Sequence, residues 1–319
     1  MGGLLATNLV EISKDPSCLD DGGFWAVSST FEGEFVAAKF ATVDKKEFPV
    51  QTWQQLQSSW KSSLNKDEYV NYVERIRELI SGGWVYQVNA CRILSNKSDV
   101  KSLAGLFSKI LQENPSPLAS YLQIPGLNIA SASPELFLSR DGDAIKTSPI
   151  KGTQEPNKGS FSQKDRAENI MIVDLMRNDL GQVCKSGSIQ VPRLLSSEDH
   201  PGLTHLVSDI HGTLVNDVSW NVIFDLLSPA GSISGAPKSS ATQMIRDNEG
   251  VRGPYCGVLG WVQSDRAELS VAIRIFWKDQ GIHFGTGAGI TWSSNALDEW
   301  NETVLKADRL IKIAGGSLS

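Results

Sequence analysis

The chain has 319 residues, of which 40% are hydrophobic and 21% charged, and its net charge is -6. This composition is that of a globular protein and excludes a disordered, collagen-like or coiled-coil chain. The acidic balance argues against nucleic acid as the main partner, because binding a phosphate backbone needs a basic surface. A small anionic substrate remains possible where a few cationic side chains gather locally.

Cysteine usage and hydropathy indicate the compartment. The four cysteines, Cys18, Cys91, Cys184 and Cys256, are dispersed and form no C-x-x-C pair, so neither a disulfide framework nor a zinc site is indicated. No stretch approaches the roughly 18 apolar residues that span a bilayer, and the N-terminal residues lack the features of a signal peptide. We therefore expect a cytoplasmic protein with reduced thiols and no membrane partner.

The first part of the chain predicts a hairpin, a polar connection and then a helix. Residues 24–29 and 34–42 are strand-like and flank a Glu-Gly turn. Residues 51–65 are polar and are interpreted as a linker with some helical character. Residues 67–80 carry apolar side chains at helical spacing and end at a glycine pair, so a helix is expected there.

The remaining chain alternates between runs of strands and helices. Further strands are expected at 84–94, 118–124, 127–132, 135–140, 143–147, 206–215, 255–263, 268–277 and 282–287. Further helices are expected at 103–111, 163–180, 220–227, 239–246 and 296–314. Because regular βαβ alternation is absent, the pattern predicts an α+β fold with mostly antiparallel sheets and disfavours a Rossmann fold.

Two of these helices carry acidic residues three positions apart, so each pair shares one helix face. Asp165 and Glu168 lie on the first helix, while Glu299 and Glu302 lie on the last, followed one turn later by Lys306. Magnesium prefers carboxylate oxygens, so two facing helices can build a magnesium site. The alternative is that these carboxylates complement the helix dipoles and face water. Spacing alone favours that alternative.

Other candidate residues lie in strands and turns. Lys151 follows an apolar residue and precedes glycine, so it is either a shielded nucleophile or a solvated lysine in a turn. Glu135 at a strand start suits a general acid or an edge-strand charge. His205 lies at the entry of a strand, where a structural role competes with a catalytic one. Arg274 is a cation in an apolar strand and is expected to pair with an anion, which is either a structural carboxylate or a ligand.

Two glycine-rich segments suit the binding of an anion. Residues 228–238 are dense in turn-forming residues, include Ser232 and Ser234, and precede a helix whose N-terminal N–H groups can face a carboxylate. Gly287 and Gly289 belong to a G-x-G-x-G segment without a βαβ unit, so a dinucleotide loop is a weak interpretation. A loop that donates amides to a carboxylate suits that segment better.

The order of these motifs along the chain resembles that of the chorismate-utilising enzymes. The matching segments are 133–135, 149–153, 165–169, 171–180, 191–192, 205–208, 235–238, 272–274, 287–290 and 299–303. The resemblance covers about residues 65–313. It implies one large domain of two mostly antiparallel sheets packed together with helices outside, as in anthranilate synthase component I. Residues 1–64 would then be shortened N-terminal strands of that domain.

The resemblance also implies residue roles. Lys151 matches the lysine that adds to ring carbon C2 in aminodeoxychorismate synthases, the branch of the family that aminates chorismate at C4 for 4-aminobenzoate and folate synthesis. Glu135 would protonate the departing hydroxyl. Gln87 matches the position of a water-activating lysine in the isochorismate and salicylate enzymes, and a neutral amide cannot act as that base. Magnesium would bind Glu168 and Glu302, with Glu299 and Asp165 close by. The remaining substrate contacts would come from Gln87, Thr153, His205, Ser232, Ser234, Tyr255, Arg274, Gly287, Gly289 and Lys306.

The expected partner is a separate glutamine amidotransferase, because no cysteine here lies in the G-x-C-x-G motif that such enzymes use. The nearest alternative is an anthranilate-type or 2-amino-2-deoxyisochorismate-forming synthase, which aminates C2. An alternative from another class is a non-catalytic chorismate-binding subunit. That alternative predicts the loss of an acidic pair or of Glu135, and all of these residues are present.

Overall fold

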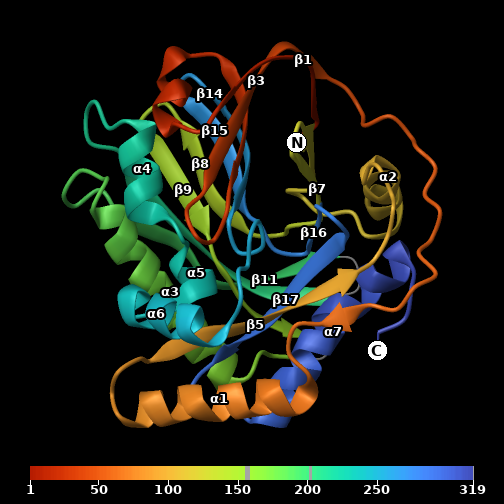
Figure 1. The fold of residues 1–319 in the computed structure, drawn as a ribbon. Helices are drawn as coiled ribbons and strands as arrows, with labels where there is room; N and C mark the ends of the chain where they lie inside the picture. Colours follow the sequence, from red (N-terminus) through yellow and green to blue (C-terminus); the bar gives the residue numbers. More distant parts are fainter. Residues whose placement is uncertain (155–158, 201–202, 319) are drawn as a thin grey trace.

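Two antiparallel sheets, packed together and covered by helices, make up the computed structural model of this chain, which describes residues 1–154, 159–200 and 203–318 (Figure 1). The main hydrophobic core contains residues of both sheets and of the helices that cover them. This arrangement confirms the α+β fold with mostly antiparallel sheets that the order of strands and helices predicts.

The larger sheet contains ten strands within the described residues. Their order is β1 (Leu4–Ser13), β3 (Phe35–Lys45), β2 (Phe24–Ser29), β14 (Val258–Gln263), β15 (Arg266–Val271), β8 (Leu136–Asp141), β9 (Ala144–Ser148), β12 (Leu203–Thr213) and β10 (Ile150–Gln154), and β11 (Gln190–His200) also pairs with β12. The N-terminal hairpin joins this sheet because β2 pairs with β14 along its whole length.

The smaller sheet contains seven strands in the described part of the chain. Their order is β13 (Gly235–Ala236), β5 (Gln87–Asn96), β17 (Ile282–Ile290), β16 (Ile275–Lys278), β7 (Leu127–Ser131) and β6 (Ser120–Ile124), and β4 (Lys61–Ser62) also pairs with β5. The long pairing of β5 with β17 forms the centre of this sheet.

The helices divide between the two sheets. They are η1 (Pro16–Asp21, a 3-10 helix), α1 (Lys66–Ser81), α2 (Ala104–Glu113), α3 (Gln163–Gly181), α4 (Trp220–Leu227), α5 (Gly231–Ser234), α6 (Lys238–Asn248) and α7 (Ala296–Ala314). In Figure 1, α3 to α6 gather on one side of the molecule, whereas α1 and α7 lie against β5 and β17. The two long helices that carry acidic pairs, α3 and α7, therefore come from different layers.

Local sequence explains where the main helices begin. Asn65 and Glu68 form a reciprocal capping box at the start of α1, and Ser162 and Asp165 form one at the start of α3. Asn295 caps α7 by accepting hydrogen bonds from two backbone N–H groups. The sequence predicted the Ser162 box and the 296–314 bounds of α7, and the structure confirms both.

One predicted strand is wrong in an informative way. Residues 268–277 form two strands in different sheets, β15 and β16, because the chain turns at Arg274, which has a left-handed φ of 51°. A second crossing between the sheets runs from β7 to β8 through Glu135. The two crossings are joined by backbone hydrogen bonds from Ala132 N to Arg274 O (3.0 Å) and from Val271 N to Glu135 O (3.0 Å). Both charged residues are thereby held between the sheets.

The expected helical linker is also wrong. Residues 51–65 form no helix, and Leu56 and Trp60 instead make bridges to Gly315 and Leu318 at the other end of the chain. Trp60 is fully buried and its indole N–H donates to Gly315 O at 2.9 Å, so this segment packs against the C-terminus. Strands β1, β10 and β11 were not predicted, because their sequences carry turn-forming or polar residues that sheet pairing overrides.

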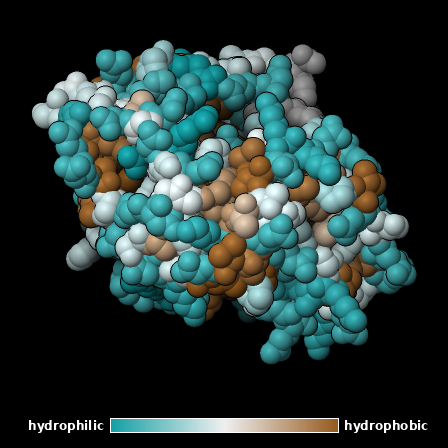
Figure 2. Space-filling view, turned by 90° about the horizontal axis from the view of Figure 1, so that it is seen from above, coloured by the Kyte–Doolittle hydropathy of each residue, from teal (hydrophilic) through white to brown (hydrophobic). Residues whose placement is uncertain are grey.

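A large apolar cavity lies at the end of the molecule that Figure 2 views from above, where the N-terminal strands and α2 meet. Its volume is about 550 Å³, and its lining includes Phe48, Phe107 and Tyr121, whose rings pack against one another. Hydrophobic groups gather near the centre of this face, with smaller groups toward its left and right edges (Figure 2). Within the described residues, no helix is long and apolar enough to cross a membrane.

Candidate active site

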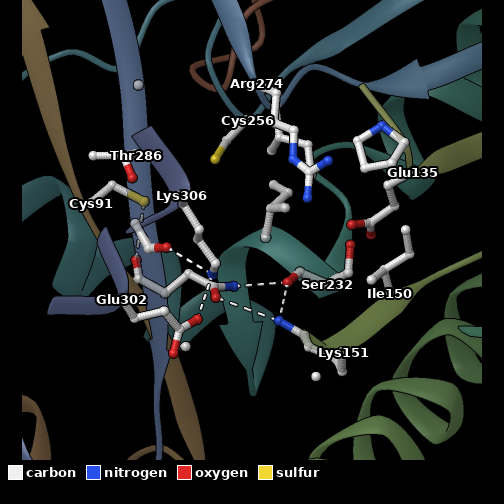
Figure 3. A pocket seen from close by; sticks show the side chains of 18 of the residues that line it. Cys91, Glu135, Ile150, Lys151, Ser232, Cys256, Arg274, Thr286, Glu302 and Lys306 are labelled. Atoms are coloured by element: carbon white, nitrogen blue, oxygen red, sulfur yellow. Dashed lines mark hydrogen bonds and ion pairs between the residues drawn. The ribbon is translucent and has the colours of Figure 1, made fainter. Parts of the chain in front are cut away.

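A second pocket, of about 160 Å³, lies where the chain crosses between the sheets, and its lining is rich in charged groups (Figure 3). The residues of the sequence-based prediction that line it are Glu135, Lys151, Asp165, Glu168, His205, Ser232, Tyr255, Arg274, Gly287, Gly289, Glu299, Glu302 and Lys306. They come from both sheets and from α3, α5 and α7. Residues far apart in sequence thus meet in one small volume.

Two predicted site residues do not belong to this lining, and a third lies partly outside what the structure describes. Gln87 is fully buried at the start of β5, and it packs so closely behind Gly289 that a Cβ there would lie 2.4 Å from its Nε2. The Ser234 hydroxyl donates to Ala230 O at 2.9 Å, a contact within its own helical turn. Thr153 pairs through its backbone with His205 across β10 and β12, and its side chain lies outside the described residues.

Lys151 projects from β10 into the pocket. Its Nζ donates to Ser232 O at 2.6 Å and lies 3.5 Å from Asn89 Oδ1. Burial lowers its pKa, and the nearest hydrogen-bonding partners are uncharged. The adjacent Gly152 adopts a φ of +84°, and a Cβ there would lie 2.9 Å from the Asp165 Cβ. Glycine therefore lets β10 approach the start of α3 and brings Lys151 beside the acidic residues.

Glu135 faces Lys151 across the pocket. It is 4% exposed, and burial raises its pKa against the opposing effects of the Ser232 hydroxyl and Lys151. In Figure 3 the Ser232 hydroxyl lies next to the Glu135 carboxylate. A carboxyl group whose pKa is raised holds its proton closer to neutral pH, which is what a general acid requires.

Arg274 lies at the upper wall of the pocket in Figure 3, and His205 also lines the pocket. Arg274 Nη2 and His205 Nε2 are 3.0 Å apart, and burial lowers the pKa of Arg274 to about 10. The guanidinium is still charged at neutral pH. Within the described part of the chain, no carboxylate forms an ion pair with it at salt-bridge distance, so it can bind a carboxylate from a ligand.

The opposite wall carries ion pairs. Lys306 Nζ lies 2.6 Å from Glu302 Oε1 and 3.1 Å from Gly287 O. Burial would lower the pKa of Lys306, but the Glu302 carboxylate outweighs burial and raises it. The pKa of Glu302 is lowered for the matching reason, since Lys306 outweighs burial there. This lysine is therefore an ammonium that faces the pocket.

The carboxylates of α3 and α7 meet at Lys164. Its Nζ is 2.8 Å from Glu299 Oε1 and 3.8 Å from Glu168 Oε1. Burial raises the pKa of Glu168 to about 7, and the neighbouring negative charges of Glu299 and Glu302 add to that effect. Asp165 is engaged in the capping box, where its carboxylate accepts from Ser162 Oγ at 2.6 Å.

These carboxylates fit a hard divalent cation by the chemistry of their donors. Glu168 Oε1 is buried and forms no hydrogen bond within the described residues. Glu299 and Glu302 line the same pocket from the facing helix. The described side chains do not gather three or more metal-binding groups at ligand distance, and Lys164 lies between two of the carboxylates instead. A cation bound here would need to displace that ammonium.

Sequence reasoning missed three charged or polar residues of this pocket, Asn89, Lys164 and Thr286. Asn89 lies two positions after Gln87 on β5, so strand alternation could have assigned it to the same face. Lys164 is four residues before Glu168 on a predicted helix, and this i,i+4 spacing indicates an ion pair. The buried thiols of Cys91 and Cys256 also line the pocket, and nothing in their spacing indicates that.

Comparison with known proteins places the chain in a family. The chorismate binding enzyme family matches residues 28–312. The chain belongs to this family. It is 35% identical over 292 residues to aminodeoxychorismate synthase component 1 of Escherichia coli (strain K12), covering 87% of this chain and 64% of that protein. It is 35% identical over 267 residues to anthranilate synthase component 1 of Saccharolobus solfataricus, covering 79% of this chain and 63% of that protein.

Solved structures show the same fold. Anthranilate synthase component I from Streptococcus pneumoniae TIGR4 aligns with a TM-score of 0.85 at 21% identity, covering 97% of this chain and 91% of that chain. The menaquinone-specific isochorismate synthase from Escherichia coli aligns with a TM-score of 0.81 at 16% identity, covering 98% and 85%. The chain spans less than two thirds of the length of the curated relatives it matches first. The resemblance drawn from the motifs is thus confirmed for family and fold.

Proposed function

We propose that this chain aminates chorismate at C4 with ammonia and forms 4-amino-4-deoxychorismate, a precursor of 4-aminobenzoate for folate synthesis. The observation that carries the proposal is the Lys151 amine, which enters the pocket between uncharged hydrogen-bond partners and has a lowered pKa. An amine that is deprotonated more easily is a better nucleophile. The relative from Escherichia coli named aminodeoxychorismate synthase component 1 supports the same assignment.

Lys151 and Glu135 would carry the chemistry in two substitutions. In the first, a bond forms between Lys151 Nζ and ring carbon C2, the two ring double bonds shift, and the C4 hydroxyl leaves as water with a proton from Glu135. In the second, ammonia bonds to C4, the double bonds shift back, and the C2–Nζ bond breaks to return the lysine. The Glu135 carboxylate then accepts a proton from the new amine.

The charged walls would hold the two carboxylates of chorismate. Arg274 and Lys306 are cations that face the pocket from opposite sides. Ser232, Tyr255 and the backbone of Gly287 and Gly289 complete that lining. Because these cations are local, the net charge of -6 does not prevent the binding of an anion.

Magnesium would be held by Glu168 and Glu302, with Glu299 and Asp165 close by, and would supply positive charge that clamps a substrate carboxylate. Ammonia would come from a separate glutamine amidotransferase subunit, as the designation of the relatives as component 1 suggests. Free ammonium salts should replace that partner in vitro. The other expected substrate contacts are Gln87, Thr153, Ser234 and His205. Among those whose side chains the structure describes, His205 lines the pocket, whereas Gln87 and Ser234 do not.

The second candidate is amination at C2, which forms anthranilate or 2-amino-2-deoxyisochorismate. It is favoured by the similarity to anthranilate synthase component 1 at 35% identity. The position of Lys151 discriminates, because a lysine adduct at C2 occupies the carbon that direct amination would use. The alternative of a non-catalytic binding subunit has no support from the pocket, where both acidic pairs and Glu135 are present.

The deciding experiment is incubation of the purified protein with chorismate, Mg²⁺ and an ammonium salt, followed by chromatography and mass analysis of the product. We expect 4-amino-4-deoxychorismate that forms only with the metal present. Anthranilate as the product would exclude C4 amination, and the absence of any metal-dependent product would exclude both candidates.

A further inference from the structure

Asn89 makes contacts that converge on Lys151. It lies in β5 and is 8% exposed, with its side chain in the pocket lining. Its Nδ2 donates to Ser232 O at 2.9 Å, while its Oδ1 is 3.5 Å from Lys151 Nζ. Lys151 Nζ in turn donates to the same Ser232 oxygen at 2.6 Å. Asn89, Ser232 and Lys151 therefore form a closed triangle of hydrogen bonds.

This triangle determines which atom of the Asn89 amide faces the lysine. The Ser232 carbonyl can only accept, so the amide nitrogen must point toward it and the amide oxygen toward Lys151. The backbone of Asn89 is fixed as well, because its carbonyl accepts from Arg252 Nη2 at 2.7 Å and its strand pairs with Gly289. Arg252 is itself 1% exposed, so the acceptor is mounted on a rigid part of the fold.

Two fixed acceptors leave the amine one free direction. An uncharged lysine amine has two N–H groups and one lone pair, arranged tetrahedrally with Cε. Ser232 O takes one N–H and Asn89 Oδ1 takes the other. The lone pair is then confined to the remaining tetrahedral direction, and the amine is held at one wall of the pocket that Glu135 and Arg274 also line (Figure 3). We propose that Asn89 is a positioning residue that fixes the orientation of the Lys151 amine for attack on the substrate ring.

The lack of charge on Asn89 is part of this role. A carboxylate at the same place would pair with the lysine and hold it as an ammonium, as Glu302 does for Lys306 in the same pocket. An apolar side chain would leave one N–H without an acceptor and the amine free to rotate. Asparagine alone of these choices both orients the amine and leaves it uncharged. The inference rests on the proposed function, since it assigns Lys151 as the nucleophile.

The test measures the lysine adduct directly. Protein with chorismate and Mg²⁺ but without ammonia is quenched in acid, and its peptides are analysed for Lys151 carrying chorismate minus one water. The variants are Asn89→Val, Asn89→Asp and the control Asn96→Val, which alters another buried asparagine of β5 that bonds to Ser58 outside the pocket. Thermal unfolding of each variant, kcat and the KM for chorismate are measured in parallel.

We expect Asn89→Val to slow adduct formation and kcat by about tenfold to a hundredfold while the KM changes little, because only the approach of the amine is affected. Asn89→Asp should lose as much at neutral pH and recover part of it at higher pH. Asn96→Val should lower the unfolding temperature and leave kcat unchanged.

Two outcomes separate the inference from the function on which it rests. An adduct that forms in Asn89→Val at the wild-type rate overturns the inference and leaves the proposed function intact. No adduct in the wild type, together with anthranilate as the product, overturns the proposed function and the inference with it. Equal losses of stability and kcat in Asn89→Val and Asn96→Val would show a structural role only, and would also overturn the inference.

Discussion

The pocket contains lysines on two sides, and their surroundings shift the lysine pKa in opposite directions. Lys151 lies on the side that carries the proposed nucleophile, and Lys164 and Lys306 lie on the acidic side with Glu168, Glu299 and Glu302. Lys151 is half-buried, hydrogen-bonds to a carbonyl and lies near an amide, and its pKa is lowered by burial. Lys306 is also half-buried, but it pairs with Glu302, and its pKa is raised. Lys164 pairs with Glu299 and its pKa is raised as well.

The comparison teaches that the charge of the partner, and not burial, decides the state of each lysine. Burial acts to lower the pKa of all three lysines. At Lys164 and Lys306 a carboxylate at hydrogen-bond distance outweighs burial and raises the pKa, whereas the pKa of Lys151 stays lowered. The proposed reaction uses this difference, because it needs an uncharged amine at C2 and fixed cations at the substrate carboxylates.

The largest expected effect comes from removing Lys151, the lysine whose pKa is lowered. Lys151→Ala should lower C4 amination by about a thousandfold or more, because no other amine in the lining has a lowered pKa. Chorismate binding should change little, since Arg274 and Lys306 remain. Product formation by mass analysis and chorismate affinity by calorimetry check both expectations.

A matched control tests whether charge or nucleophilicity matters at this position. Lys151→Arg keeps a cation of similar length that stays protonated at neutral pH and cannot attack C2. It should be as inactive as Lys151→Ala. Full activity of either variant would contradict the nucleophile role of Lys151. The lowered pKa of Lys151 would then have no consequence for the reaction that distinguishes it from Lys164 and Lys306.

Glu135→Gln removes the proton donor that faces Lys151. The rate should fall by about a hundredfold or more, within the range typical of a lost general acid. Because burial raises the pKa of Glu135, the wild-type rate should fall as the pH rises through that raised value. The rate of the glutamine variant should lose this dependence. A pH profile of kcat for both proteins checks the expectation, and identical profiles would exclude Glu135 as the acid.

Many residues that line this pocket could be predicted from the sequence. The motif residues that line it were predicted one by one, and the caps at Ser162 and Asn295 explain why α3 and α7 begin where their acidic pairs are needed. Spacing along a helix and a strong stop signal are local properties, so sequence patterns report them well.

The parts that failed depend on long-range contacts. The run 268–277 is uniformly strand-like, and only pairing with two different sheets breaks it at Arg274. Strand β10, which carries Lys151, contains a glycine and depends on β12 for its hydrogen bonds. The displacement of Gln87 behind Gly289 follows from how closely β5 and β17 approach, which no local pattern encodes.

The effect of burial on a charged group of the acidic side can also be measured through the free energy of unfolding, with Glu168 as the group. Its folded pKa is about 7, raised by burial above the ordinary value of 4.5. A carboxyl with a raised folded pKa contributes stability that is complete below its unfolded pKa and is lost as the pH rises through the folded value. In metal-free protein with a chelator, Glu168→Gln should therefore match the wild type near pH 5 and be more stable at pH 8 by about 3 kcal/mol.

Urea unfolding at both pH values measures this difference. Asp174→Asn is the matched control, because Asp174 lies on the same helix with its carboxylate exposed to solvent and, among the described residues, paired only with Arg177. It should change stability little at either pH. A Glu168→Gln variant that is less stable than the wild type at pH 8 would show that the metal-free site needs the charge.

The smallest expected effect concerns Lys164, which occupies the space between two carboxylates that the proposed magnesium would use. Its ammonium opposes a divalent cation by repulsion and by competition for Glu299. Lys164→Met should therefore tighten Mg²⁺ binding by about fivefold to tenfold, as expected for removing one positive charge a few ångströms away in a partly hydrated site. It should also lower the unfolding temperature of the metal-free protein, because Glu299 loses its partner.

Calorimetric titration of Mg²⁺ and thermal unfolding with and without the metal check this last expectation. Arg166→Met is the control, since it removes a positive charge from the same turn of α3 at an exposed position outside the pocket lining. Its effect on Mg²⁺ affinity should be smaller because solvent screens the charge. If Lys164→Met weakened Mg²⁺ binding, the lysine would be a supporting residue of the metal site. In that case the Lys164 ammonium would orient the carboxylates that bind the metal, and it would not compete with the metal for them.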